Sequence, residues 1–230
     1  MIRHVLDDIS FSINPESLAK HVKIKKETEY FKTLYDLVQD AEKIARPKAL
    51  YKPAFIETKG DDQVVIEETI FKSRILKVNL ENIYRVFIFV ATCGMEIDQW
   101  SKSIGGVLDR FIADAIKIFA MQTAVKAMDE HIRENYDIIK KSRMTPGSLK
   151  DWPITEQRPV FKLLGDVEGD IGVCLMDSLM MDPVQSISGI IFPTETSFES
   201  CQLCPRENCP GRRAAYDKNL YEKKYKPKAG

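Results

Sequence analysis

The sequence predicts an α+β fold, a twisted and mostly antiparallel sheet with flanking helices that include one long central helix. Two observations predict it. Apolar residues recur at helical spacing over residues 31–45 and 104–136, whereas residues 49–92 are rich in β-forming runs. Because helices and strands come in unequal blocks along the chain, the α+β class is favoured.

The N-terminal third begins with two helices. Asn14, Pro15 and Glu16 combine a capping side chain, a proline suited to the first helical position and an acid in the first turn, which predicts a short helix ending near Val22. The apolar spacing over residues 31–45 predicts an amphipathic helix. Pro47 marks its end, since the residue before a proline is disfavoured in helical geometry.

The sheet is predicted over residues 54–56, 64–66 and 86–90, with turn residues at 60–62. A short helix over residues 96–103 precedes the long helix over residues 104–136. Later elements are shorter. They are a turn at 145–147, a helix over 155–164, and strands near 171–175 and 186–192.

We expect two parts in the chain. Residues 1–198 form the α+β body, and residues 199–230 form an irregular cysteine-containing segment that binds metal and ends in a polar tail. The tail from Lys218 onward is rich in lysine, and we expect it to fray.

Charge and hydropathy exclude several partners. Lys plus Arg and Asp plus Glu both total 34, so no summed field attracts nucleic acid or an acidic membrane surface. The strongest apolar run, residues 86–93, is too short to span a bilayer, and the N-terminus has no apolar signal core. The five cysteines are an odd number with a local cluster, which favours a reducing compartment. We therefore expect a cytoplasmic protein.

The cluster is the triplet Cys201, Cys204 and Cys209, spaced C-x2-C-x4-C. Such short loops let sulfurs converge on one metal centre, so the triplet predicts an iron-sulfur cluster or, failing that, zinc. A fourth ligand is not local, because His4, His21 and His131 all lie far along the chain. Cys174, Cys93 or a non-protein ligand are the candidates. The alternative is three unrelated surface thiols, or a single disulfide formed on oxidation.

A second motif follows the long helix, in the order Arg143-Met144-Thr145-Pro146-Gly147-Ser148. A fixed guanidinium beside a Pro-Gly turn can clamp a ligand carboxylate through two hydrogen bonds. Gly147 lets the backbone approach a ligand closely. The alternative is an ordinary turn with a solvent-exposed arginine.

This loop, the leucine-containing stretch at residues 161–164 and the strand Ser186-Ile187-Ser188-Gly189 together resemble the activation, or reactivation, domain of vitamin B12-dependent methionine synthase. The family signature is R-x-x-P-G-Y, a Leu-rich helix and an S-x-S-G strand. The resemblance is most specific over residues 143–193. It implies binding of S-adenosylmethionine, whose methyl group goes to a corrinoid cobalt after one-electron reduction of inactive Co(II).

By this resemblance, Arg143 holds the methionine carboxylate and the backbone of residues 144–147 lines the adenosyl group. Two residues depart from the family pattern. Ser148 stands where the motif has Tyr, and Lys126 stands about where some members have a Glu facing the ligand. Either change can weaken binding of S-adenosylmethionine or alter its pose.

The sequence has no room for homocysteine, folate and corrinoid modules, so the resemblance implies a stand-alone module acting in trans on a corrinoid-binding methyltransferase or methionine synthase. We expect the cofactors to carry the chemistry, with no catalytic side chain from the protein. The cysteine triplet is then expected to pass an electron to cobalt, replacing or assisting a flavodoxin-like donor. The alternative is a non-enzymatic corrinoid-protein interaction module with structural zinc and no S-adenosylmethionine binding.

Overall fold

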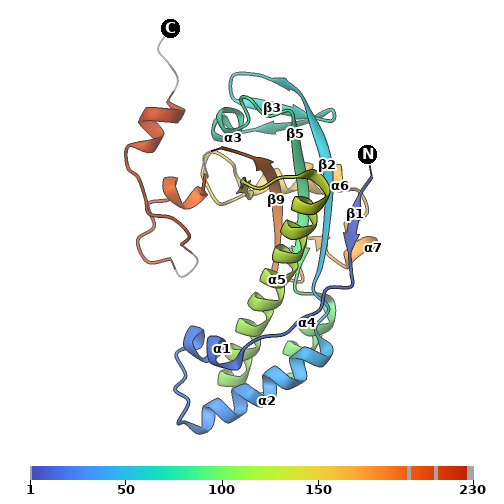
Figure 1. Ribbon diagram of the computed structural model, residues 1–230, viewed down its shortest axis with the longest axis vertical. Helices are drawn as coiled ribbons and strands as arrows, with labels where there is room; N and C mark the ends of the chain where they lie inside the picture. The colour runs from blue at the N-terminus through green and yellow to red at the C-terminus, as the bar shows by residue number, and fades with distance from the viewer. Residues whose placement is uncertain (1, 196–197, 210–211, 227–230) are drawn as a thin grey trace.

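A seven-stranded antiparallel sheet forms the centre of the molecule in a computed structural model that describes residues 2–195, 198–209 and 212–226 (Figure 1). Its strands are β1 (His4–Leu6), β2 (Lys48–Lys59), β3 (Gln63–Ile66), β4 (Thr69–Lys72), β5 (Arg85–Thr92), β6 (Lys141–Met144) and β9 (Ser186–Pro193). The order across the sheet is β4-β3-β2-β5-β9-β6, with β1 also paired to β2. The short strands β7 (Cys174–Leu175) and β8 (Met181–Asp182) form a separate hairpin.

Helices cover both faces of this sheet. They are α1 (Pro15–Val22), α2 (Glu29–Ile44), α3 (Arg74–Asn79), α4 (Met95–Ser103), α5 (Val107–Tyr136), α6 (Gln157–Leu164) and α7 (Val167–Ile171). Three shorter helical turns are η1 (Ile154–Glu156), η2 (Ser200–Leu203) and η3 (Tyr221–Tyr225). The long helix α5 crosses one face of the sheet, as Figure 1 shows. The predicted α+β fold with one long helix is confirmed.

Local sequence signals determine where α1 begins and where α2 ends. The Asn14 side chain accepts hydrogen bonds from the backbone N–H groups of Glu16 and Ser17, at 2.8 and 3.1 Å, and so satisfies two donors at the start of α1. α2 ends at Ile44, three residues before Pro47. Both helices confirm the prediction.

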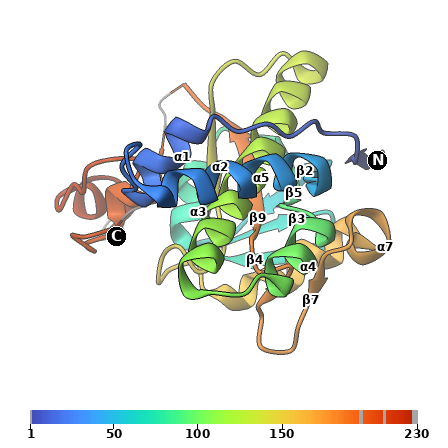
Figure 2. The same ribbon diagram turned by 90° about the horizontal axis from the view of Figure 1, so that it is seen from below.

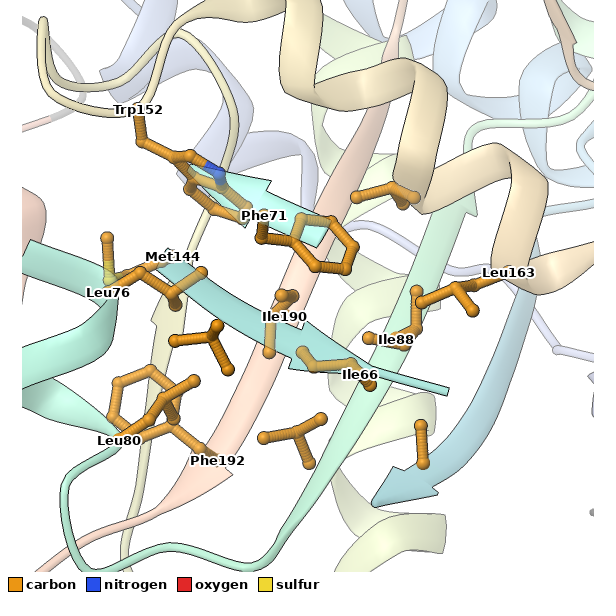
Figure 3. Packing of buried hydrophobic residues seen from close by; sticks show 14 of the residues in the cluster. Ile66, Phe71, Leu76, Leu80, Ile88, Met144, Trp152, Leu163, Ile190 and Phe192 are labelled. Atoms are coloured by element: carbon orange, nitrogen blue, oxygen red, sulfur yellow. The ribbon is translucent and has the colours of Figure 1, made fainter. Parts of the chain in front are cut away.

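Strand β5 divides the core in two. Val86, Ile88 and Val90 point into a cluster beneath α3, α6 and α7, where the rings of Trp152 and Phe71 lie 6.4 Å apart (Figure 3). The alternate side chains of β5 enter a second cluster beneath α5, formed with Ala124, Met128 and Ile132 among others. Burying each large apolar side chain stabilises the fold by about 1.5–3 kcal/mol.

A third cluster joins α1, α2, α4 and the first half of α5, and it includes the fully buried Cys93. Beside it, the carboxylate of Asp98 is 3% exposed and pairs with the ammonium groups of Lys117 and Lys102, at 3.1 and 2.7 Å. The pairing compensates the desolvation of the buried charges. It also links α4 to α5.

Several short elements differ from the prediction. β1, β4, β6 and α3 have no local signal in the sequence. The strand predicted to begin at Ile171 is wrong there, because α7 occupies Val167–Ile171. The Asp166 side chain accepts a hydrogen bond from the N–H of Gly169 at 2.9 Å and caps that helix.

The fraying predicted from Lys218 onward is wrong for residues 218–226, which pack against the body, and residues 227–230 lie outside the described residues. Tyr225 is fully buried, and its hydroxyl donates to Asn79 Oδ1 over 2.8 Å. Leu203 and Leu220 lie against the same apolar cluster. The division of the chain at residue 198 stays a prediction.

Within the residues that the structure describes, no helix is long and apolar enough to cross a membrane.

Gly189 sets the distance between β9 and the edge strand β6. A Cβ atom at this position would lie 2.1 Å from the carbonyl oxygen of Met144, far inside van der Waals contact. We predict that Gly189→Ala forces the two strands apart and lowers the free energy of unfolding by about 1–3 kcal/mol. Urea denaturation followed by circular dichroism measures the change.

Gly105→Ala is the matched control, because no heavy atom lies within 4 Å of a Cβ built there. It should leave the stability within about 0.5 kcal/mol of the parent. Equal stability of the Gly189 and Gly105 variants would contradict the assigned contact.

Candidate functional site

Arg143 lies on the edge strand β6 and faces α5. Strand alternation places its neighbours Ser142 and Met144 on the opposite, buried side. The guanidinium donates a hydrogen bond from Nη2 to Asp129 Oδ1 over 2.7 Å and lies 5.1 Å from the ring centre of Phe89. Both contacts hold it in place, since an aromatic face attracts a cation.

One donor of Arg143 has no hydrogen-bond partner among the described residues. It is the Nε–H, which is buried. Buried donors normally find an acceptor, so this N–H marks a place where a ligand oxygen would be stabilised.

The acid that faces the motif is Asp129, which the sequence analysis missed. Lys126, the residue of α5 that the resemblance singles out, has a side chain that is 79% exposed, and its Nζ lies 4.0 Å from Glu130 Oε1. Asp129 lies almost one turn further along α5, where its carboxylate also meets Lys141 Nζ at 3.5 Å. No local signal in the sequence distinguishes Asp129 from the other acids of α5, because its pairing with Arg143 depends on how α5 packs on the sheet.

The turn after β6 is held by a few hydrogen bonds. The N–H of Gly147 donates to the carbonyl of Trp152 at 2.8 Å, and Gly147 has a φ of 80°, which favours glycine. Ser148 Oγ donates to the carbonyl of Thr145 at 2.7 Å and lies 3.3 Å from Ser200 Oγ. Ser148 therefore joins this turn to the residue before Cys201.

The cysteine segment lies along the edge of the sheet. The backbone of Glu199 forms a parallel bridge with Arg143, and the N–H of Phe198 donates to Ser142 Oγ at 2.7 Å. Cys201 then falls within η2, and the chain continues through Cys204 and Cys209. The segment is seen beside the sheet in Figures 1 and 2.

Arg212 contacts all three cysteines through their backbone. Its guanidinium donates to the carbonyls of Cys201 and Cys204, each at 3.2 Å, and its own N–H donates to the carbonyl of Cys209 at 3.1 Å. The next residue, Arg213, donates its backbone N–H to Cys201 Sγ over 3.4 Å. The backbone of the loop therefore surrounds the Arg212 guanidinium.

All five thiols are free. Across residues 2–195, 198–209 and 212–226, no three His, Cys, Asp or Glu side chains are grouped closely enough to hold a metal ion. Neither protein candidate for a fourth ligand is near the triplet. Cys93 is buried in the cluster of α1, α2, α4 and α5, and Cys174 lies on β7, on the opposite side of the molecule from the C-terminal segment (Figure 2).

A groove of about 750 Å³ brings the two sequence motifs together. One wall is formed by residues 147–151, and the other by residues 203–205 and 216–218 together with Tyr221. Gly147 and Ser148 therefore face the same space as Cys204. Arg143 does not line this groove, because its side chain lies on the α5 side of the sheet.

No protein-family model and no curated protein matches the sequence. Among solved structures, the crystal structure of the MetH reactivation domain bound to AdoHcy is similar to this chain, with a TM-score of 0.64 and 16% sequence identity. The alignment covers 87% of this chain and 81% of that one. The chain has the MetH reactivation domain fold. The resemblance predicted from the Arg143 loop and the Gly189 strand is confirmed at the level of the fold.

The five cysteines of this chain lie in different environments. Burial, aided by the charge of Asp98, raises the pKa of the Cys93 thiol to about 12, whereas the triplet is partly exposed. Because the thiolate is the reactive form, we predict that iodoacetamide at neutral pH labels Cys201, Cys204 and Cys209 in the metal-free native chain and spares Cys93. Peptide mass spectrometry over a time course measures each site.

In denaturant all five cysteines should react at similar rates, which is the control for intrinsic reactivity. Native labelling of Cys93 as fast as that of Cys174 would contradict the burial assigned here.

Proposed function

We propose that this chain is a reactivation module that binds S-adenosylmethionine and supports reductive methylation of the Co(II) corrinoid of methionine synthase or another corrinoid methyltransferase, acting in trans. The observation that carries the proposal is the fold shared with the MetH reactivation domain bound to AdoHcy. AdoHcy is the molecule left when S-adenosylmethionine has lost its methyl group.

The groove supports the adenosyl part of this ligand. Its volume of about 750 Å³ lies within the range of about 300–1,000 Å³ that small-molecule sites occupy. Gly147 is exposed there and lets a ligand reach the backbone, while Tyr216 and Tyr221 offer aromatic surface. The family resemblance assigns the adenosyl group to the backbone of Met144, Thr145, Pro146 and Gly147, with Ser148 beside them. Of these residues, Gly147 and Ser148 line the groove.

Arg143 is the residue that the family resemblance assigns to the carboxylate part. Its side chain lies on the α5 side of the sheet and outside the groove, so a ligand held by both Arg143 and the groove would have to reach around the edge strand β6. Its unpaired Nε–H is a charge-assisted donor in a buried setting, where such hydrogen bonds are strong. Asp129 accepts the hydrogen bond from Nη2 and so fixes the plane of the guanidinium. A ligand carboxylate would therefore bind through the remaining donors. Asp129 is therefore a positioning residue for this clamp.

The chemistry belongs to the partner's corrinoid and to S-adenosylmethionine. One electron converts Co(II) to Co(I), and the methyl group then passes from sulfur to cobalt, which gives methyl-Co(III) and S-adenosylhomocysteine. The chain would hold and orient the methyl donor, and no side chain need transfer a proton.

A second candidate is a corrinoid-protein interaction module with structural zinc and no S-adenosylmethionine binding. Two observations favour it. Glu199 pairs with the backbone of Arg143 at the sheet edge, and Ser148 replaces the tyrosine of the family motif. Ligand binding separates the two candidates.

We predict that Arg143→Ala weakens S-adenosylmethionine binding about 10- to 100-fold, because a hydrogen bond to a charged group contributes about 1.5–3 kcal/mol. Isothermal titration calorimetry measures the affinity. Lys126→Ala is the matched control, since this side chain points to solvent from the same helix that carries Asp129.

Arg143→Lys keeps the charge but loses the planar fork, and it should also bind more weakly than the parent. Circular dichroism establishes that each variant is folded. If Arg143→Ala binds as tightly as the parent, the clamp assignment is wrong.

Activity is tested by mixing the chain with a Co(II) corrinoid methyltransferase, S-adenosylmethionine and titanium(III) citrate under anaerobic conditions. We predict conversion to methyl-Co(III), followed by the visible absorption of the corrinoid and by mass spectrometry of S-adenosylhomocysteine. Omitting S-adenosylmethionine should abolish it. Binding of the corrinoid protein without conversion would favour the interaction module.

A further inference from the structure

Cys201 and Cys204 lie at the two ends of one tight turn. The N–H of Cys204 donates to the carbonyl of Cys201 at 3.2 Å, which closes the 3₁₀ turn η2. A 3₁₀ helix has three residues per turn and rises about 2.0 Å per residue, so residues three apart lie about 6 Å apart on one face. A disulfide spans Cα separations of about 4.4–6.8 Å. The backbone therefore holds these two cysteines at a separation that a disulfide can bridge.

Hydrogen bonds from outside the turn hold this backbone in place. The Arg212 guanidinium donates from Nη1 to the carbonyl of Cys201 and from Nη2 to the carbonyl of Cys204, each over 3.2 Å. At the start of the turn, Gln202 Oε1 accepts a hydrogen bond from the N–H of Glu199 at 3.0 Å as part of a capping box. Both cysteines are thus ordered before any bond joins their sulfurs, which lowers the entropic cost of closing a ring between them.

We propose that Cys201 and Cys204 form a reversible disulfide and that Cys209 stays outside it. Both thiols are free and partly exposed, so a small oxidant can reach them. Only the two side chains have to rotate, among the three staggered positions of χ1. Cys209 belongs to a different turn, in which its carbonyl accepts a hydrogen bond from the N–H of Arg212 at 3.1 Å.

The oxidant that fits this pair is a low-molecular-weight disulfide such as oxidised glutathione. The Cys204 sulfur attacks the small disulfide, which breaks its S–S bond, forms a mixed disulfide and releases one small thiol. The Cys201 sulfur then attacks the Cys204 sulfur and releases the second small thiol. The two protons of the protein thiols end on the released thiols, and the two electrons of the pair reduce the small disulfide. Excess small thiol reverses the exchange, as in cysteine pairs that sense the redox state of a reducing compartment.

The pair borders the proposed ligand groove. Cys204 forms part of one wall with Leu203 and Pro205, opposite Gly147 and Ser148. Resting on the proposed function, S-adenosylmethionine in the groove covers this wall and hinders the approach of the oxidant. The chain without ligand is therefore the form that responds to oxidants, and the chain that carries the methyl donor is protected.

Disulfide formation is tested on the full chain, incubated with oxidised glutathione and trapped with N-ethylmaleimide. Cleavage after Glu199 and Arg206 releases residues 200–206, whose cysteines are Cys201 and Cys204. We expect this peptide to lose the mass of two hydrogen atoms and to take up no N-ethylmaleimide, and we expect reduced glutathione to restore both thiols. A parent chain that carries only glutathione adducts, or a disulfide that includes Cys209, would overturn the proposal.

Cys209→Ser is the matched control and should form the disulfide as fast as the parent. Cys201→Ser and Cys204→Ser each keep one thiol of the pair and should stop at a mixed disulfide with glutathione. Arg212→Lys keeps the positive charge but cannot serve both cysteine carbonyls with one planar fork. It should lower the equilibrium constant for disulfide formation against glutathione about three- to tenfold while its circular dichroism spectrum is unchanged. An unchanged constant would overturn the organising role of Arg212.

Protection by the ligand is tested separately. With S-adenosylmethionine at about ten times the Kd measured by calorimetry, the rate of disulfide formation should fall about tenfold, because only the free chain reacts. Alkylation of Cys209, which is not among the described residues that line the groove, should keep its rate. Unchanged oxidation at saturation would overturn the protection. Failure to bind S-adenosylmethionine would instead count against the proposed reactivation function, and the disulfide measurement would stand on its own.

Discussion

Strand β5 determines the layout of the molecule because both of its faces are buried. Residues 86–92 are fully inaccessible, so every side chain of the strand needs an apolar neighbour above or below the sheet. α5 meets that need on one face, and α3, α6 and α7 meet it on the other. The same two-sided arrangement continues through β9 to β6. It is why Arg143 faces α5 while Met144 enters the opposite cluster.

Small side chains allow the turn after β6, at residues 145–148, and the cysteine segment to lie close together. Gly189 lets β6 lie close against β9, and Ser148 leaves space for η2 beside the turn. A tyrosine at position 148, as in the family motif, would occupy the space where Ser148 meets Ser200.

Much of the fold follows from local sequence signals, and the parts that do not are set by distant contacts. α1, α2 and α5 were predictable because caps and apolar spacing act within a few residues. β6 was not, because its four residues are mostly polar and become a strand only by pairing with β9. In the site, the spacing of the cysteines was visible in the sequence. The Asp129–Arg143 pair and the backbone contacts of Arg212 depend on the folded chain.

The burial of Tyr225 changes the thermodynamics of the cysteine segment. The chain is held to the body at Phe198 on one side and at Tyr225 on the other, where Asn79 accepts the tyrosine hydroxyl. A loop whose ends are already fixed has lost much of its conformational entropy during folding, so ordering it further costs less than ordering a free tail. Local opening of this loop is thus coupled to release of Phe198 or Tyr225 from the body, and the order of the cysteine segment should rise and fall with the stability of the domain itself.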